Sequence, residues 1–222
     1  MTFHVLTLFP EMITQMTNHS ILGRALMSGH IHVNPINIRD FAINKYGQVD
    51  DAPYGGGAGM VMMAQPIFNA WKSVTTTPTP RVIYLTPQGK PLTQATAQAL
   101  SAEKELILLC GHYEGIDERI IEEIVTDEIS IGDYVLTGGE PAALVLMDAI
   151  SRLIPGVLKK EASHQEESFS DGRLEYPQYT RPAVFQGRAV PEVLLSGHHG
   201  KVKQWRDEQS LKRTQEKRPD LL

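Results

Sequence analysis

The feature that most constrains the fold is an alternation of apolar, strand-like runs with helical segments through residues 3–152. Apolar runs of strand length occupy residues 3–9, 81–85 and 105–110. Proline stands at the start of two of the helical segments, where the first turn accepts it. The predicted helices begin at residue 10 and cover residues 93–103, 116–125 and 140–152. Such alternation is typical of an α/β protein with an open parallel sheet covered by helices on both faces.

A polar segment at residues 159–170 predicts a linker between two domains. It lacks apolar periodicity and follows the helix-stopping pair Pro155-Gly156. Residues 1–158 then form the larger domain, and residues 171–222 form a second, small domain. In the second domain, residues 176–182 are predicted to be extended and residues 193–195 and 201–217 to be helical. The C-terminal domain is therefore predicted to be mainly helical.

Charge is distributed unevenly between these two parts. Residues 1–171 carry 11 Lys and Arg against 20 Asp and Glu, a net of −9, whereas residues 172–222 carry 10 against 6, a net of +4. A local basic patch attracts a polyanion even when the whole chain is acidic. The basic C-terminal piece is either a phosphate-binding surface or a solvated helix face, and charge alone does not separate the two.

Composition and cysteine content exclude several classes of protein. The hydrophobic fraction of 41% and the charged fraction of 21% are ordinary for a globular chain, and they argue against disorder or a fibre. Cys110 is the lone cysteine, and its apolar run favours a packed strand residue over a nucleophile. No secretory signal begins at Met1, and no apolar run reaches the roughly 18 residues that span a bilayer. We therefore expect a cytoplasmic protein without a membrane segment.

Three glycine-marked loops follow strand-like segments and point to a ligand site. They are residues 86–89, 111–115 and 131–139. Ligands of open parallel sheets bind beyond the carboxyl ends of strands, where glycine lets the backbone approach them closely. Any one of these loops alone is better explained as a tight turn. Three together favour a cradle for one nucleoside.

A fourth glycine cluster, at residues 54–60, does not support a dinucleotide site. The preceding stretch is polar and loop-like, and the chain contains neither G-x-x-x-x-G-K-[ST] nor an intact G-x-G-x-x-G. The cluster is predicted to be a loop with backbone donors. It forms either a simple turn or a surface that contacts RNA phosphates or covers the site.

Seven stretches in this order resemble the bacterial tRNA (guanine-N1)-methyltransferases and together cover nearly the whole chain. They are PYGGGAGMVM (53–62), YLTPQG (84–89), CGHYEGIDERI (110–120), IGDYVLTGGE (131–140), RLIPGVL (152–158), SFSDGRLEYPQYTRP (168–182) and LLSGHHG with KQWR (194–206). One position departs from the family pattern, because many members have Arg where this chain has His112.

The resemblance implies a fold and an assembly that no sequence rule would predict. The family belongs to the SPOUT class, in which a deep trefoil knot forms the cofactor site and two subunits of a homodimer complete each active site. Knots are otherwise rare in proteins. It also implies methyl transfer from S-adenosyl-L-methionine to N1 of guanosine 37 of tRNA, immediately 3′ of the anticodon. The product would be 1-methylguanosine.

The resemblance assigns two catalytic residues. Asp171 matches the family's catalytic aspartate, which would remove the proton from guanine N1 as a general base. Arg152 matches the arginine that would stabilise negative charge on the guanine O6. Without the resemblance, Asp171-Gly172 would be an ordinary turn and Arg152 would equally suit compensation of a helix dipole.

The same matching gives the candidate cofactor-binding residues, most of which would act through their backbone groups. Glu114 among them would face the positively charged end of the cofactor or, alternatively, stand at a helix start. The complete set is Tyr84, Leu85, Pro87, Gly111, Tyr113, Glu114, Gly115, Ile131, Gly132, Asp133, Tyr134, Val135, Leu136, Gly138 and Gly139.

The C-terminal cations are the candidate RNA-binding residues, acting on phosphates without sequence choice. Trp205 is predicted to pack in the protein instead of stacking on a base. No dedicated metal site is predicted, because His198 and His199 lack matching partners; any Mg²⁺ used in catalysis would be held mainly by substrate and water. The candidate RNA contacts are Lys201, Lys203, Arg206, Lys212 and Arg213.

Two other functions stay open on the residues alone. The first is a knotted methyltransferase that acts on another RNA site or on a ribose hydroxyl, which would need no base to deprotonate guanine. The second is a non-catalytic RNA-binding module whose glycine loops are purely structural. Substitution of Asp171 separates the first from the guanine-N1 activity, and a titration with S-adenosylmethionine separates the second.

Overall fold

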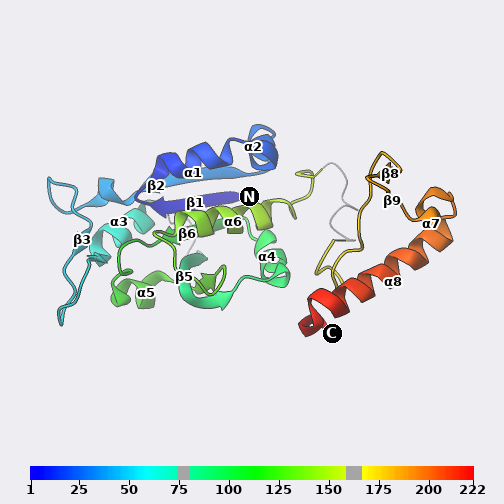
Figure 1. Ribbon diagram of the computed structural model, residues 1–222. Helices are drawn as coiled ribbons and strands as arrows, with labels where there is room; N and C mark the ends of the chain where they lie inside the picture. Colours follow the sequence, from blue (N-terminus) through cyan, green and yellow to red (C-terminus); the bar gives the residue numbers. More distant parts are fainter. Residues whose placement is uncertain (75–80, 159–166) are drawn as a thin grey trace. The chain divides into compact units, whose positions relative to one another are not determined.

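Five parallel strands form the central sheet of the chain (Figure 1), in the order β2-β1-β6-β5-β7. A computed structural model describes residues 1–74, 81–158 and 167–222. The bounds of the five strands are Thr2–Thr7 for β1, His32–Asn37 for β2, Val82–Pro91 for β5, Glu105–Cys110 for β6 and Asp127–Ser130 for β7. Every pairing between neighbouring strands is parallel, which confirms the α/β fold with an open parallel sheet.

Helices cover both faces of this sheet because successive strand side chains point to opposite sides. In β6, Leu106, Leu108 and Cys110 pack on one face, while Ile107 and Leu109 pack on the other. The first face is covered by α1 (Pro10–Thr17), α2 (Ser20–Met27), α4 (Gln94–Ser101) and α6 (Glu140–Ser151). The second is covered by α3 (Ala64–Val74) and α5 (Glu118–Ile124), and Figure 1 shows α1 and α3 on opposite sides.

Several sequence predictions agree closely with these bounds. Strand β6 has the predicted limits, and α6 begins at Glu140 with Pro141 in its first turn, as expected. The Thr93 side chain accepts a hydrogen bond from the Thr96 N–H at the start of α4. Cys110 is fully buried in its strand, and burial raises the pKa of its thiol. This confirms that Cys110 is a packing residue.

Other elements were not predicted from the sequence. They include α2, α3, β2 and the small pair formed by β3 (Asp50–Asp51) and β4 (Val61–Met62), as well as the 3₁₀ turn η1 (Ile38–Phe41). Strand β7 was expected only as a strand-like segment before residue 131, without bounds. Strand β2 contains Pro35, which is tolerated because β2 is an edge strand of the sheet. Strand β7 has only four residues and begins with two acids, so no apolar run marks it.

The chain divides into two units, Met1–Lys159 and Lys160–Leu222. The second contains a β-hairpin of β8 (Val184–Phe185) and β9 (Arg188–Ala189), followed by α7 (Glu192–Leu195), α8 (His199–Lys217) and the 3₁₀ turn η3 (Pro219–Leu221). Helices α7 and α8 agree with the predicted helices, and residues 176–182, which were predicted to be extended, contain neither helix nor strand. The hairpin was not predicted.

The predicted linker falls largely outside the described residues. Residues 159–166 are not described, whereas residues 167–170 are hydrogen-bonded within the second unit. The Phe169 N–H, for example, donates to the carbonyl of Arg173 over 2.7 Å. Of the twelve residues in the predicted linker, at least the last four therefore belong to the structure that carries Asp171.

Candidate functional site

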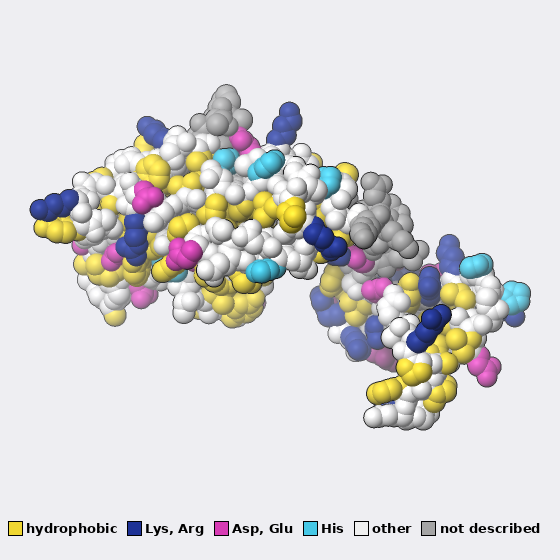
Figure 2. Space-filling view, turned by 90° about the horizontal axis from the view of Figure 1, so that it is seen from above, with side chains coloured by type: hydrophobic (Ala, Val, Ile, Leu, Met, Phe, Trp, Pro, Cys, Tyr) yellow, Lys and Arg dark blue, Asp and Glu magenta, His cyan; other side chains and the backbone are white. Residues whose placement is uncertain are grey.

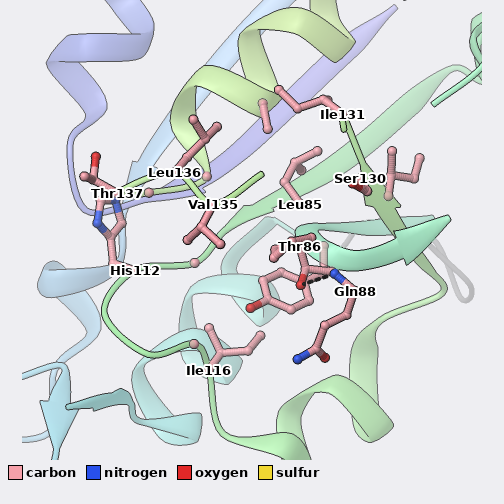
Figure 3. Close-up of a pocket in the computed structure, with 18 of the residues that line it drawn as sticks. Leu85, Thr86, Gln88, His112, Ile116, Ser130, Ile131, Val135, Leu136 and Thr137 are labelled. Atoms are coloured by element: carbon pink, nitrogen blue, oxygen red, sulfur yellow. Dashed lines mark hydrogen bonds between the residues drawn. The ribbon is translucent and has the colours of Figure 1, made fainter. Parts of the chain in front are cut away.

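A cavity of about 340 Å³ opens at the carboxyl ends of β5, β6 and β7. Three segments provide most of its lining: Tyr84–Gln88 from β5, Gly111–Ile116 after β6, and most of the residues between Ile129 of β7 and Ala142 of α6. Figure 3 shows side chains of all three segments around this cavity, among them Leu85, Ile116 and Leu136. The size lies within the range of small-molecule sites, and the position is the usual ligand site of an open parallel sheet.

A bulge in β5 forms the first wall of the cavity. Leu85 and Lys90 both pair with Ile129 of β7, so the intervening residues leave the ladder. The predicted loop at residues 86–89 is thus a bulge within a longer strand that continues to Pro91, and we correct the prediction in that respect. Glycine is required at position 89, because a side-chain carbon there would collide with the backbone of Glu128 and Ile129.

The third loop returns from the sheet edge to the second loop. After β7 the chain passes the end of β5, and the Gly139 N–H donates to the Gly111 carbonyl over 2.9 Å. Residues 112 and 138 form an isolated antiparallel bridge. A Cβ at Gly139 would lie 2.7 Å from Cα of Cys110, a distance that only glycine avoids. Close backbone contact therefore joins the two loops.

A buried carboxylate connects these loops to the first strand. Glu140 is 1% exposed at the start of α6, and its Oε2 lies 2.7 Å from Nε2 of His112. The Thr7 hydroxyl donates to the other oxygen of this carboxylate over 2.5 Å. The phenyl ring of Phe9 lies 5.1 Å from the imidazole, centroid to centroid. His112 is thus the partner of a buried acid.

Every predicted cofactor-binding residue except Asp133 lines this one cavity. The candidate set was taken from positions that match the family, and it left out several other residues that line the cavity. Tyr84 is 7% exposed, and burial raises the pKa of its phenol. The lining residues that were not predicted are Thr86, Gln88, His112, Ile116, Glu118, Ile121, Ile129, Ser130, Thr137 and Ala142.

The glycine cluster at residues 54–60 lies beside the second loop of the cavity. It contains neither helix nor strand, and the Met60 carbonyl accepts a hydrogen bond from the Glu114 N–H over 3.0 Å. The loop prediction is confirmed. Asp117 caps α5 by accepting from the Arg119 N–H, so the alternative of Glu114 as a helix-start carboxylate is wrong. Glu114 instead lines the cavity.

Arg152 lies away from this cavity. It caps the C-terminal end of α6 and lines a second, more apolar cavity of about 570 Å³ with Met16, Leu144 and Val145 among its neighbours. Ala142 is the last residue of α6 to line the first cavity, and ten further residues of helix correspond to about 15 Å. The two cavities share no lining residue.

Asp171 belongs to the second unit, where it begins a turn. Its Oδ1 accepts a hydrogen bond from the Arg173 N–H over 3.2 Å, and Gly172 has a φ of 80°, a conformation that favours glycine. The side chain of Asp171 is exposed. The carboxylate is therefore held by a local turn and stays open to a ligand.

The five candidate RNA-binding cations all lie on α8, but they differ in exposure. Lys201, Lys203 and Lys212 are exposed, whereas the Arg206 guanidinium stacks on the Tyr176 ring, 4.6 Å from its centroid. Arg213 is half-buried near the Glu175 carbonyl. Lys and Arg side chains are visible on the surface of this unit in Figure 2.

Three further sequence predictions concern Trp205, metal binding and membrane spans. Trp205 is half-buried, and its ring lies 6.3 Å from that of Tyr179, which agrees with a packing role. Within residues 1–74, 81–158 and 167–222, no group of three or more His, Cys, Asp or Glu is arranged to hold a metal ion. None of the helices in these ranges combines the length and apolar character required to cross a bilayer.

Comparison with known proteins identifies the family to which this chain is similar. Residues 1–222 match the family model described as tRNA (Guanine-1)-methyltransferase TrmD. A protein of Ruminiclostridium cellulolyticum is 60% identical over 224 residues, covering 100% of this chain and 96% of its own length. A protein of Clostridioides difficile is 59% identical over 224 residues, covering 100% and 97%. A protein of Staphylococcus epidermidis is 60% identical over 222 residues, covering 100% and 91%. All three are named tRNA (guanine-N(1)-)-methyltransferase.

Proposed function

Because the chain belongs to the tRNA (guanine-1)-methyltransferase family, we propose that it methylates N1 of guanosine 37 of tRNA, with S-adenosylmethionine as donor. It is a methyltransferase that modifies tRNA, as its full-length relatives are named. The observation that carries the choice of donor is the cavity at the carboxyl ends of β5, β6 and β7. Family-matched residues from three separate loops meet around that one space.

The chemistry of the cavity fits an adenosine bearing a sulfonium. Glycines at positions 111, 138 and 139 leave backbone groups accessible, and the walls contributed by Leu85, Ile116, Ile131 and Leu136 are aliphatic. Glu114 supplies a carboxylate at the cavity, suited to the positive end of the donor. When bound, S-adenosylmethionine supplies an electrophilic methyl group.

Two side chains of the protein complete the proposed reaction. Guanine N1 carries a proton near neutral pH, so its lone pair becomes available only when a base removes that proton. Asp171 serves as the base, and its exposed carboxylate permits contact with a target nucleotide. Arg152 donates hydrogen bonds to O6, where negative charge accumulates as N1 loses its proton.

The path of the chain after β7 supports the proposed knot. Residues 131–139 leave the edge strand, pass the bulge of β5 and hydrogen-bond to the loop after β6. The bulge itself rejoins β7 at Lys90 and Pro91, which closes a loop next to this crossing. A deep trefoil knot would place the cofactor between the crossing segments, where the cavity lies.

The location of Arg152 supports the proposed homodimer. The guanine must contact both the methyl donor and this guanidinium, yet Arg152 lines a different cavity about 15 Å along α6. The second cavity is mostly apolar, and Met16 and Val145 on its rim are 57% and 47% exposed. We assign a second copy of the chain to this surface, so that Arg152 of one subunit faces the donor held by the other.

The tRNA is held electrostatically by α8. Lys201, Lys203 and Lys212 are the main phosphate contacts, because their side chains are exposed, whereas Arg206 and Arg213 are engaged within their own unit. Any Mg²⁺ that takes part is held by substrate and water, since the described residues offer no metal cluster.

Substitution of Leu136 by Arg tests the cofactor cavity. We expect at least about tenfold weaker binding of S-adenosylmethionine, because a cation enters an apolar wall close to where the sulfonium binds. Isothermal titration calorimetry measures the dissociation constant. Met27→Arg is the matched control: Met27 is 91% exposed and lines neither cavity. Equal affinity in the two variants would contradict the assignment of the donor to this cavity.

The product decides between the proposed reaction and its alternatives. Purified protein is incubated with unmodified tRNA transcript and isotope-labelled S-adenosylmethionine, and the nucleosides are identified by mass spectrometry. Labelled 1-methylguanosine at position 37 is the expected result. A labelled 2′-O-methyl ribose or label at another site would replace it with a different knotted methyltransferase activity, and absence of donor binding would favour an RNA-binding module.

A further inference from the structure

The turn that carries Asp171 is attached to α8 by a pair of side-chain hydroxyls. The Leu174 N–H donates to Oγ1 of Thr214 over 2.9 Å, and the Ser210 hydroxyl donates to the Leu174 carbonyl over 2.7 Å. Ser210 and Thr214 stand one helical turn apart, so both lie on the same side of α8. Both backbone groups of Leu174, three residues after Asp171, are thus bonded to one helix.

Burial indicates that this attachment is specific. Thr214 is 0% exposed and is the one fully buried residue of α8. Its hydroxyl also donates to the Ser210 carbonyl over 2.8 Å, so it is satisfied as donor and as acceptor. A helix that needed only to pack would bury an apolar side chain there. A buried hydroxyl with two partners fixes a backbone position instead.

Further contacts make the Asp171 turn a stiff extension of this anchor. The Phe169 N–H donates to the Arg173 carbonyl, and the Glu175 N–H donates to the Ser168 hydroxyl over 3.0 Å. The Arg218 guanidinium lies 5.8 Å from the centroid of the Phe169 ring. Residues on both sides of Asp171 are therefore bonded to each other, and the segment as a whole is bonded to α8.

We propose that Ser210 and Thr214 are positioning residues that fix the Asp171 carboxylate relative to the RNA-binding helix. This proposal depends on the proposed role of Asp171 as the base. The exposed lysines of α8 hold the tRNA, and the same helix, on its buried side, holds the turn that presents the base. Binding of the tRNA backbone and placement of the proton acceptor are thus determined by one rigid element.

A double-mutant cycle between Thr214→Val and Asp171→Asn tests the proposal. Valine keeps the shape of threonine and removes the hydroxyl. We expect Thr214→Val to lower kcat at least about tenfold, while KM for tRNA and the dissociation constant for S-adenosylmethionine change less than about twofold. In the Asp171→Asn background, the same substitution is expected to cause no further loss of kcat. The amide at position 171 does not accept the guanine proton, so its exact position no longer affects the rate. Single-turnover rates with excess enzyme allow slow variants to be compared.

Three additional variants exclude a general folding defect. Thr214→Ser keeps the hydroxyl and is expected to restore most of kcat, whereas Ser210→Ala is expected to show the pattern of Thr214→Val with a smaller loss. Thr96→Val is the matched control, because Thr96 is a threonine of helix α4 in the first unit. This variant is expected to keep the wild-type kcat. Rates are measured well below the thermal unfolding midpoint of each variant.

Each outcome bears on a different claim. Wild-type kcat for both Thr214→Val and Ser210→Ala, with Asp171→Asn impaired, overturns the positioning role alone. Equal fold losses for Thr214→Val in both backgrounds also overturn it, because the helix would then act independently of Asp171. Full activity of Asp171→Asn overturns the assignment of the base, and the positioning role with it.

Discussion

Replacing Asp171 by Asn is expected to lower the rate of methyl transfer by about 10²- to 10⁴-fold, the usual contribution of a general base. An amide does not accept the proton of guanine N1, so the N1 lone pair stays unavailable. The substitution is conservative for the structure, because the amide oxygen still accepts the hydrogen bond of the Arg173 N–H. Single-turnover assays with saturating tRNA and donor measure this loss.

Binding measurements give this prediction its control. The proposed donor cavity is built from the first unit and Asp171 lies in the second, so affinity for S-adenosylmethionine is expected to stay within about twofold of wild type. Asp207→Asn removes another exposed acid of the same unit, on α8, and is expected to leave the rate unchanged. A fully active Asp171→Asn would favour methylation of a group that needs no base, such as a ribose hydroxyl.

The buried strands and the glycine loops could be predicted from sequence because their signals are local. An uninterrupted apolar run defines β6, and glycine is required at position 139, where two backbone segments meet. Edge strands give no such signal. Strand β2 contains Pro35 and β7 begins with Asp127 and Glu128, so neither shows an apolar run. Their position in the sheet, not their composition, makes them strands.

Contacts between distant residues account for what the sequence did not reveal at the site. The sequence showed that His112 departs from the family pattern, but not that it pairs with Glu140, 28 residues away. It also did not reveal that Thr7, 133 residues from Glu140, completes this cluster. Likewise, Arg206 and Lys203 look equivalent in the sequence, and only the fold places Tyr176 against Arg206. Residue type was enough to identify the candidates, but only tertiary packing shows which of them are exposed and which are engaged with other side chains.

The sequence also did not reveal that Arg152 and the proposed donor cavity lie apart within the first unit. Arg152 follows the cavity loops closely in the chain, yet α6 carries it about 15 Å from the last residue of the helix that lines the cavity. This separation makes the proposed homodimer testable by subunit complementation.

Mixing two inactive variants is expected to restore activity if each site combines one subunit's cavity with the other's Arg152. Leu136→Arg is expected to weaken donor binding at least about tenfold, so the assay uses a donor concentration well below the dissociation constant of this variant, where its sites are nearly inactive. Arg152→Ala is expected to lower the rate about 10²- to 10³-fold by removing stabilisation of O6. In a mixed dimer, one site receives both defects and the other receives neither. After random exchange half of the dimers are mixed, so about one quarter of the wild-type sites become active.

An active site formed within a single subunit predicts a different result, so the experiment distinguishes the two arrangements. If Arg152 served the cavity of its own subunit, each site of a mixed dimer would carry one defect, and the mixture would be no more active than its components. A different affinity tag on each variant checks that exchange occurs, because only mixed dimers carry both tags. Coexpression with two affinity tags isolates the mixed dimer, in which one of the two sites, about half of the wild-type activity, is expected. Activity at that level would require that the donor and the guanidinium come from different chains, as we propose from the separation of the two cavities along α6.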